Sequence, residues 1–196
     1  MIFTRGDFNG YKSLNEQAVN ESRQRTRYFS ATKPYSGTTV FISHKHDDLD
    51  LGELDGVIGM LKQHNVIPYI DSMDNKMPEH TCAETAKRIK QVIEFCDKFI
   101  LLATNSAIES YWCNWEVGIG DVRKYKNHIA ILPMKDVGKN YNGNEYLKLY
   151  SSIEYFDGTR SYSNGDNISA GYYVRTPTEE NNYNIEPLKN WLEKRY

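Results

Sequence analysis

The chain has 196 residues and a formal net charge of −2, which suits one domain with a substantial buried core. The near-neutral charge gives no reason to expect nucleic acid as a partner, and no apolar stretch approaches the roughly 18 residues that a membrane helix needs. The first residues lack the apolar segment of a signal peptide, and the three cysteines lack C-x-x-C spacing. We therefore expect a cytoplasmic protein with reduced thiols, no membrane contact and no disulfides.

Residues 1–37 are expected to be an N-terminal extension. Within it, 13–27 are predicted to form a short helix, with Ser13 as the cap and Glu16 at the spacing of a capping box. The segment has too few apolar residues for a core of its own. We interpret it as a regulator of assembly or a cover for a cleft.

Residues 38–157 are predicted to form an α/β core. Short apolar runs alternate with stretches of helical periodicity, which favours a parallel sheet covered on both faces. The expected strands cover 38–43, 67–71, 98–103, 128–134 and 150–156, and the expected helices cover 51–65, 82–96 and 110–125. Residues 158–196 are predicted to be a Tyr/Asn-rich segment with a turn at Asn164–Gly165 and a closing helix over 185–195, packed on the core.

Ligands of such sheets bind beyond the carboxyl ends of the strands, where the strand order reverses. Three segments follow strands in this way: "SHKHDD" (43–48), "DSMDNK" (71–76) and "TNSAIESYW" (104–112). The candidate site should therefore be built from them.

The first of these segments carries two histidines, His44 and His46, which could share a face. No further His or Cys cluster completes a metal site, so we expect no metal there. Asp47 or Asp48 is more readily interpreted as the cap of the next helix.

Several common chemistries lack their motifs. No G-x-G-x-x-G follows a strand, and neither G-K-[ST] nor G-x-S-x-G occurs. The glycines of "GVIG" (56–59) lie inside a helical pattern. Cys113 with a distant histidine could be a nucleophile pair, but a helical cysteine is more often a small packing residue.

The stretch "SYWCNWEVGIG" (110–120) places Glu116 in apolar company. Trp112 lies four residues earlier and so shares its helix face, while Trp115, Ile119 and Val122 are predicted to pack on the sheet. From spacing alone, a satisfied helix carboxylate and a functional one are equally acceptable. The position of the helix after the third strand favours function, because an apolar wall raises a carboxylate pKa and strengthens its interaction with a developing cation.

These segments resemble a bacterial TIR (Toll/interleukin-1 receptor) domain, from about Thr38 to Phe156. "VFISHKHDD" is similar to the first box of the family, "DSMDNKMPEHTCAETAKRIKQ" to its long loop and following helix, and "FILLATNSAIESYWCNWEVG" to its third box. The flanking regions resemble those of stand-alone TIR proteins of Thoeris-type antiphage defence. The resemblance implies a flavodoxin-like three-layer sandwich with a five-stranded parallel sheet.

The resemblance also implies an enzyme that cleaves NAD⁺ between nicotinamide and ribose, with NAD as substrate and no cofactor. Glu116 is then the catalytic residue, and Trp112 lies beside the nicotinamide ribose. The other residues that the resemblance places around the pocket are Ser43, His44, Lys45, Ile70 and Asp71. One carboxylate could suffice, because nicotinamide leaves as a neutral molecule and needs no proton, unlike an ordinary glycosidic leaving group.

The fate of the ADP-ribosyl centre stays open: water gives ADP-ribose, an internal nucleophile gives a cyclic isomer, and another molecule gives a conjugate. The expected role is an ADP-ribose-derived signal that reaches a separate effector protein, with self-association through TIR domains. Two alternatives remain at this point. One is a non-enzymatic TIR adaptor acting through residues 72–80 and helix faces; the other is a nucleoside deoxyribosyltransferase-like enzyme.

Overall fold

The structure is a computed structural model that describes residues 2–32, 35–48, 51–78, 82–124, 126–178 and 182–194. The strands are β1 (Phe3–Thr4), β2 (Thr38–Ser43), β3 (Val66–Tyr69), β4 (Lys98–Ala103), β5 (Ile129–Lys135), β6 (Ser151–Phe156), β7 (Gly171–Pro177) and β8 (Tyr183–Pro187). The α-helices are α1 (Asn9–Leu14), α2 (Glu16–Arg27), α3 (Leu51–Lys62), α4 (Ala83–Phe95), α5 (Asn105–Glu109), α6 (Tyr111–Arg123) and α7 (Leu188–Glu193). Short 3₁₀ turns are η1 (Asp71–Met73), η2 (Lys126–His128) and η3 (Tyr146–Leu149).

One mixed sheet runs through the molecule in the order β3-β2-β4-β5-β6-β7-β8, and β1 pairs with β5. The strands from β3 to β6 are parallel, whereas β7 and β8 add antiparallel to one edge. The predicted fold class and its five parallel strands are therefore confirmed. The antiparallel pair extends the sheet beyond what the sequence indicated.

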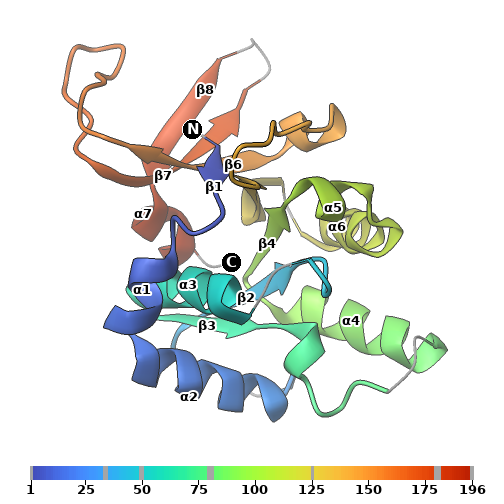
Figure 1. The fold of residues 1–196 in the computed structure, drawn as a ribbon. Helices are drawn as coiled ribbons and strands as arrows, with labels where there is room; N and C mark the ends of the chain where they lie inside the picture. Colours follow the sequence, from blue (N-terminus) through green and yellow to red (C-terminus); the bar gives the residue numbers. More distant parts are fainter. Residues whose placement is uncertain are drawn as a thin grey trace.

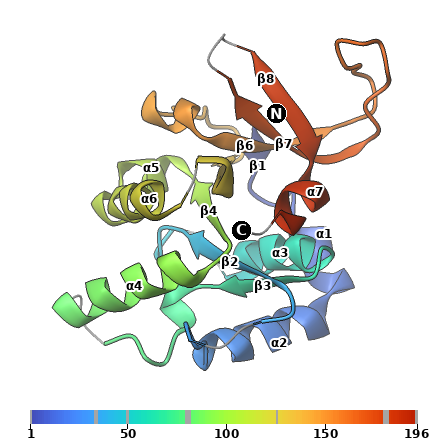
Figure 2. The ribbon, with the colours of Figure 1, turned by 180° about the vertical axis from the view of Figure 1, so that it is seen from behind.

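Alternating strand residues divide the core into two layers. Val40 and Ile42 of β2 face the side covered by α1, α3 and α7, while Phe41 faces the side covered by α4, α5 and α6. Figures 1 and 2 show these two groups of helices on opposite sides of the sheet. Every residue of β2 and β4 is buried, as expected of central parallel strands.

The N-terminal segment packs on the same core. Phe3, Phe8 and Val19 are buried in the layer that contains α3. The single helix expected over 13–27 is wrong in its start: Ser13 lies inside α1, and Asn15 separates α1 from α2. Asn15 leaves the helical conformation while its side-chain amide donates to the carbonyl oxygens of Tyr11 and Gly59, so a tertiary contact sets this break.

Helix α2 lies along the edge strand β3. The hydroxyl of Thr26 is fully buried and donates to the carbonyl of Pro68 at 3.1 Å. Covering an edge strand with a helix removes a template for unwanted strand pairing. The domain boundaries at 37 and 157 stay a prediction, although both flanking segments join the common core and sheet.

The C-terminal segment follows the predicted order with one shift. Gly165 has a positive φ of +91° and its N–H donates to the carbonyl of Tyr162, which forms the expected turn. The closing helix is shorter than predicted, because 183–187 pair with β7 as β8; residue 195 lies outside the described residues. Its predicted apolar face is confirmed, since Leu188, Trp191 and Leu192 are buried.

The packing predicted for the third core helix is wrong for Val122, whereas Trp115 and Ile119 are partly buried against the core as expected. Its buried residues are Cys113, Glu116, Val117 and Gly120, whereas Val122 is 80% exposed. Among the described helices, none has the length and apolarity needed to cross a membrane.

Candidate active site

The candidate site lies where β2 and β3 end and α6 begins. Ser43 is the last residue of β2, and Asp71 follows β3 at the start of η1. Helix α6 starts at Tyr111 because the hydroxyl of Ser110 accepts from the N–H of Cys113, which caps the helix. Glu116 lies in the second turn of α6 and so points back toward the ends of the strands.

Glu116 is only 1% exposed, and one of its oxygens is unpartnered. The hydroxyl of Ser43 donates to Oε2 of Glu116 at 2.5 Å, while the buried Oε1 has no hydrogen-bond partner among the described residues. Burial, followed by the charge of Asp71, raises the pKa of Glu116 well above its ordinary value, against the opposing effects of Ser43 and Trp112. A buried carboxylate with an unused acceptor is typical of a site that awaits a ligand.

A cavity of about 350 Å³, the Glu116 cavity, is lined by two residues that influence the pKa of Glu116, although Glu116 itself does not line it. Trp112 forms one wall and is half-buried, with its ring stacked on Trp115 at 4.9 Å between centroids. The other lining residues are His46, Asp71, Ser72, Asp74, Met77, Pro78 and Thr85. Residues 79–80, the end of the loop that the sequence analysis assigned to 72–80, lie outside the described residues.

Two histidines follow β2 directly. His44 is 5% exposed, whereas the side chain of His46 is 45% exposed and its Nε2 lies 3.0 Å from both carboxylate oxygens of Asp71. The hydrogen bond to Asp71 raises the pKa of His46, and burial lowers the pKa of His44. Sequence analysis named Asp71 for the pocket but had no signal for its partnership with His46, which joins two different strands.

A buried polar network fixes the loop after β3. Asp74 accepts from the hydroxyl of Tyr69 at 2.8 Å and from Nε of Arg88 at 2.9 Å, and Arg88 also donates to the carbonyl of Phe29. These contacts join the loop to α4 and to the end of the N-terminal segment. Asp74 and Arg88 were missed in the sequence because neither lies in a recognisable motif.

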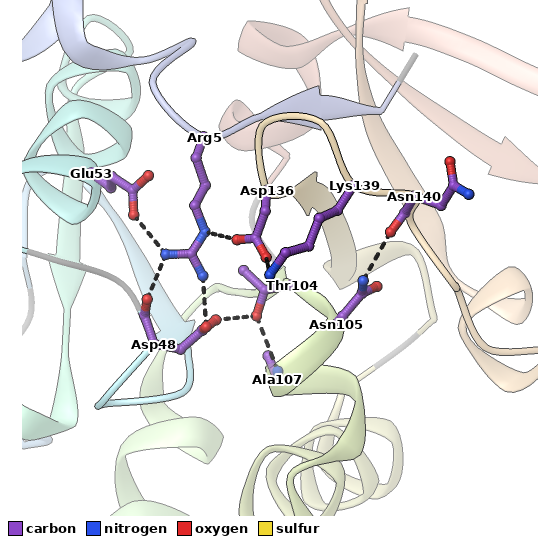
Figure 3. Close-up of polar contacts among 9 residues, drawn as sticks. All are labelled: Arg5, Asp48, Glu53, Thr104, Asn105, Ala107, Asp136, Lys139 and Asn140. Atoms are coloured by element: carbon purple, nitrogen blue, oxygen red, sulfur yellow. Dashed lines mark hydrogen bonds and ion pairs between the residues drawn. The ribbon is translucent and has the colours of Figure 1, made fainter.

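A second network, drawn in Figure 3, fixes the loop after β2. Arg5, which follows β1, donates to the backbone carbonyl of Asp48 at 2.5 Å and to its carboxylate at 2.6 Å, and it pairs with Asp136 at 2.6 Å. The other carboxylate oxygen of Asp48 accepts from the hydroxyl of Thr104, just after β4. These contacts attach the segment that carries His44 and His46 to the ends of β1, β4 and β5.

The remaining predicted site residues are placed as follows. Lys45 is half-buried in the same loop, and the side chain of Ile70 is fully buried in the core rather than in the wall of the cavity. Substrate contact by the seven predicted residues stays a prediction. Cys113 is buried and its pKa is raised by burial, which argues against a nucleophilic thiolate and for the packing role.

A larger cavity of about 580 Å³ lies along β5, β6 and the strands beyond them. None of the seven predicted residues lines it, and its buried carboxylate, Glu154, is already paired with Arg175 at 3.3 Å and with Ser152. The reactive features of the described chain therefore gather at the Glu116 cavity.

The parallel strands follow the order β3-β2-β4-β5-β6, and α6 carries its carboxylate at their carboxyl edge. This arrangement is a flavodoxin-like α/β fold and agrees with the fold expected of a TIR domain. Comparison with curated proteins finds a relative that aligns with nearly the whole chain. The chain is 27% identical over 211 aligned positions to a probable 3′ cyclic ADP-D-ribose synthase, ThsB′, of Bacillus cereus (strain MSX-D12), and the match covers 98% of each chain. The resemblance to stand-alone TIR proteins of Thoeris-type defence is confirmed by this relationship, while no protein-family model matches the chain.

Proposed function

We propose that this protein is a TIR-type NAD⁺ cyclase that cleaves the nicotinamide–ribose bond and closes the product into a cyclic ADP-ribose. The observation that carries the proposal is the buried Glu116, whose Oε1 has no hydrogen-bond partner among the described residues and whose neighbours Trp112 and Asp71 line a cavity. The full-length similarity to a probable cyclic ADP-ribose synthase supports the substrate and the cyclic product.

In this mechanism the nicotinamide ribose lies between Trp112 and Glu116. The C1′–N bond breaks, its electron pair goes to the pyridine nitrogen, and nicotinamide departs as a neutral molecule. Glu116 accepts a hydrogen bond from the ribose through Oε1 and stabilises the positive centre that develops at C1′. One such preorganised electrostatic contact is typically worth about 10²–10³ in rate. An internal nucleophile of the ADP-ribosyl group then bonds to C1′ and loses its proton.

The raised pKa of Glu116 fits a cationic substrate. Burial and Asp71 favour the neutral acid in the free protein, and the positive nicotinamide ring favours the carboxylate once it binds nearby. A cavity that excludes water after binding favours an internal nucleophile over hydrolysis.

The proposed role is a nucleotide signal in antiphage defence that acts through a separate effector protein. Self-association with other TIR domains is part of this proposal. NAD is then a substrate, and the described reaction needs no cofactor.

The test uses Glu116→Gln, which keeps the side-chain volume but removes the charge. Glu109→Gln is the matched control, because Glu109 is an exposed carboxylate on the neighbouring helix α5. Nicotinamide and cyclic ADP-ribose are quantified by mass spectrometry, with purified protein and in phage-challenged cells. We expect at least a 100-fold loss in Glu116→Gln alone. Equal product formation by Glu116→Gln and the unmodified protein would refute the assignment.

A further inference from the structure

Three potential metal ligands meet at the mouth of the Glu116 cavity. His44 and His46 come from the loop after β2, and Asp71 comes from the end of β3. One ligand atom from each lies within 4.8 Å of the others, and the two imidazole rings are 5.0 Å apart. The sequence showed only the two histidines, because the third ligand is 25 residues further along the chain.

The distances suit a small divalent ion. Zinc binds imidazole nitrogen and carboxylate oxygen at about 2.0–2.2 Å, so two ligands of a tetrahedral ion lie roughly 3.4 Å apart. Nε2 of His46 is 3.0 Å from both oxygens of Asp71, so only a small outward movement of this half-exposed histidine would admit an ion. The two strand ends hold His44 and Asp71 in place, which limits the reorganisation needed.

An unpartnered atom supplies an independent indication. Nδ1 of His44 is inaccessible to solvent and has no hydrogen-bond partner among the described residues, although His44 is 95% buried and a buried imidazole nitrogen normally has one. Asp71 also lies close to Glu116, and among the described residues its hydrogen bonds go to His46 and the N–H of Ser72 rather than to a Lys or Arg. A cation bound through Nδ1 of His44 would give this nitrogen a partner and reduce the repulsion between two carboxylates.

We propose that His44, His46 and Asp71 bind one divalent transition-metal ion, with Zn²⁺ as the preferred class. Two imidazoles and one carboxylate suit zinc and its neighbours, whereas magnesium and calcium prefer oxygen ligands alone. Three protein ligands leave at least one coordination position open toward the cavity, which His46 and Asp71 line.

The location has a consequence that rests on the proposed function. An ion bound to His46 and Asp71 occupies space and charge next to the expected place of the cationic nicotinamide ring. We therefore infer that Zn²⁺ competes with NAD and inhibits the enzyme reversibly. Metal binding itself does not depend on catalysis, so the two claims are tested separately.

The first experiment measures binding directly. Protein treated with EDTA and then dialysed is titrated with ZnCl₂ and, separately, with MgCl₂ by isothermal titration calorimetry. The background is Cys82→Ser, because Cys82 is an exposed thiol that could bind zinc by itself. We expect one equivalent of Zn²⁺ and no heat from Mg²⁺. His46→Ala and Asp71→Asn should each weaken Zn²⁺ binding by more than about 100-fold, since even residues behind the ligands are worth 10–100-fold.

His64→Ala is the matched control, because His64 follows α3 away from the cavity. Near-native circular dichroism and thermal unfolding establish that each variant is folded. Unchanged Zn²⁺ affinity in His46→Ala and Asp71→Asn, or no stoichiometric binding by the parent, overturns the metal site.

The second experiment measures nicotinamide release with increasing ZnCl₂. Competition raises KM for NAD with little change in kcat, and EDTA restores activity. Stoichiometric zinc binding without inhibition would leave the site intact and overturn only the competition. If the metal-free protein loses all activity, the reaction needs a metal, which contradicts the proposal that it proceeds without a cofactor.

Discussion

Replacing Ser43 by Ala tests how the protein holds Glu116. The Ser43 hydroxyl donates to Oε2 of the buried carboxylate at 2.5 Å, and this hydrogen bond lowers the pKa of Glu116 more than the contact with Trp112 does. A hydrogen bond to a charged group contributes about 1.5–3 kcal/mol, which corresponds to about 10-fold to 100-fold in the balance between carboxylate and acid. Its removal raises the pKa of Glu116 further, because the charged form loses its donor while burial remains.

The assay is nicotinamide release, measured as kcat/KM across pH, because this quantity reports ionisation in the free enzyme. For Ser43→Ala we expect a loss of about 10-fold to 100-fold on the acidic side, with recovery as pH rises and the carboxylate ionises. Ser106→Ala, at an exposed serine of α5, is the control and should leave the profile unchanged. A loss that is the same at every pH would show that Ser43 acts on geometry instead, and an unchanged profile would refute the reasoning altogether.

Three further predictions concern stability and loop position. Folding raises the pKa of Glu116 above its ordinary value of 4.5, so the free energy of unfolding is highest below that pH and falls as pH rises. Glu116→Gln should remove this fall, which is up to about 1.4 kcal/mol per pH unit, as measured by thermal unfolding from pH 5 to 8. Arg5→Gln releases the loop after β2, so KM for NAD should rise more than kcat falls, and an unchanged KM would contradict the positioning role. Gly56→Ala should cost about 1–3 kcal/mol in urea unfolding, because a Cβ would lie 2.5 Å from the carbonyl oxygen of Phe8, whereas Gly118→Ala in open space should be neutral or stabilising.

The role of Gly56 and Gly59 shows how far the sequence could be interpreted. Their presence inside a helical pattern was visible, but it indicated only that they did not form a phosphate loop. In the structure, added Cβ atoms would lie 2.5 Å from the carbonyl oxygens of Phe8 and Tyr11. The glycines therefore let α1 approach α3 closely, a requirement that depends on a segment nearly 50 residues earlier.

The packing of α6 illustrates the same limit at the site. Spacing placed Trp112 and Glu116 on one face, and the structure agrees, with Trp112 at the cavity and Glu116 beside it. The predicted packing face holds in part for Trp115 and Ile119 but not for Val122. The most buried residues of the helix include Cys113 and Val117 instead. Helical periodicity defines which residues share a face, but the neighbouring elements decide which face is buried.

Local patterns in the sequence were enough to predict the α/β class, the run of parallel strands and the segments at the carboxyl ends of the strands. Short-range patterns suffice for this, because the periodicities of buried strands and helices are local properties. The packing of distant segments places Arg5 against the loop after β2 and brings Asp71 to His44 and His46. It also leaves Oε1 of Glu116 without a hydrogen-bond partner among the described residues. Each of these facts depends on the distance between atoms on different strands, which sequence separation does not specify.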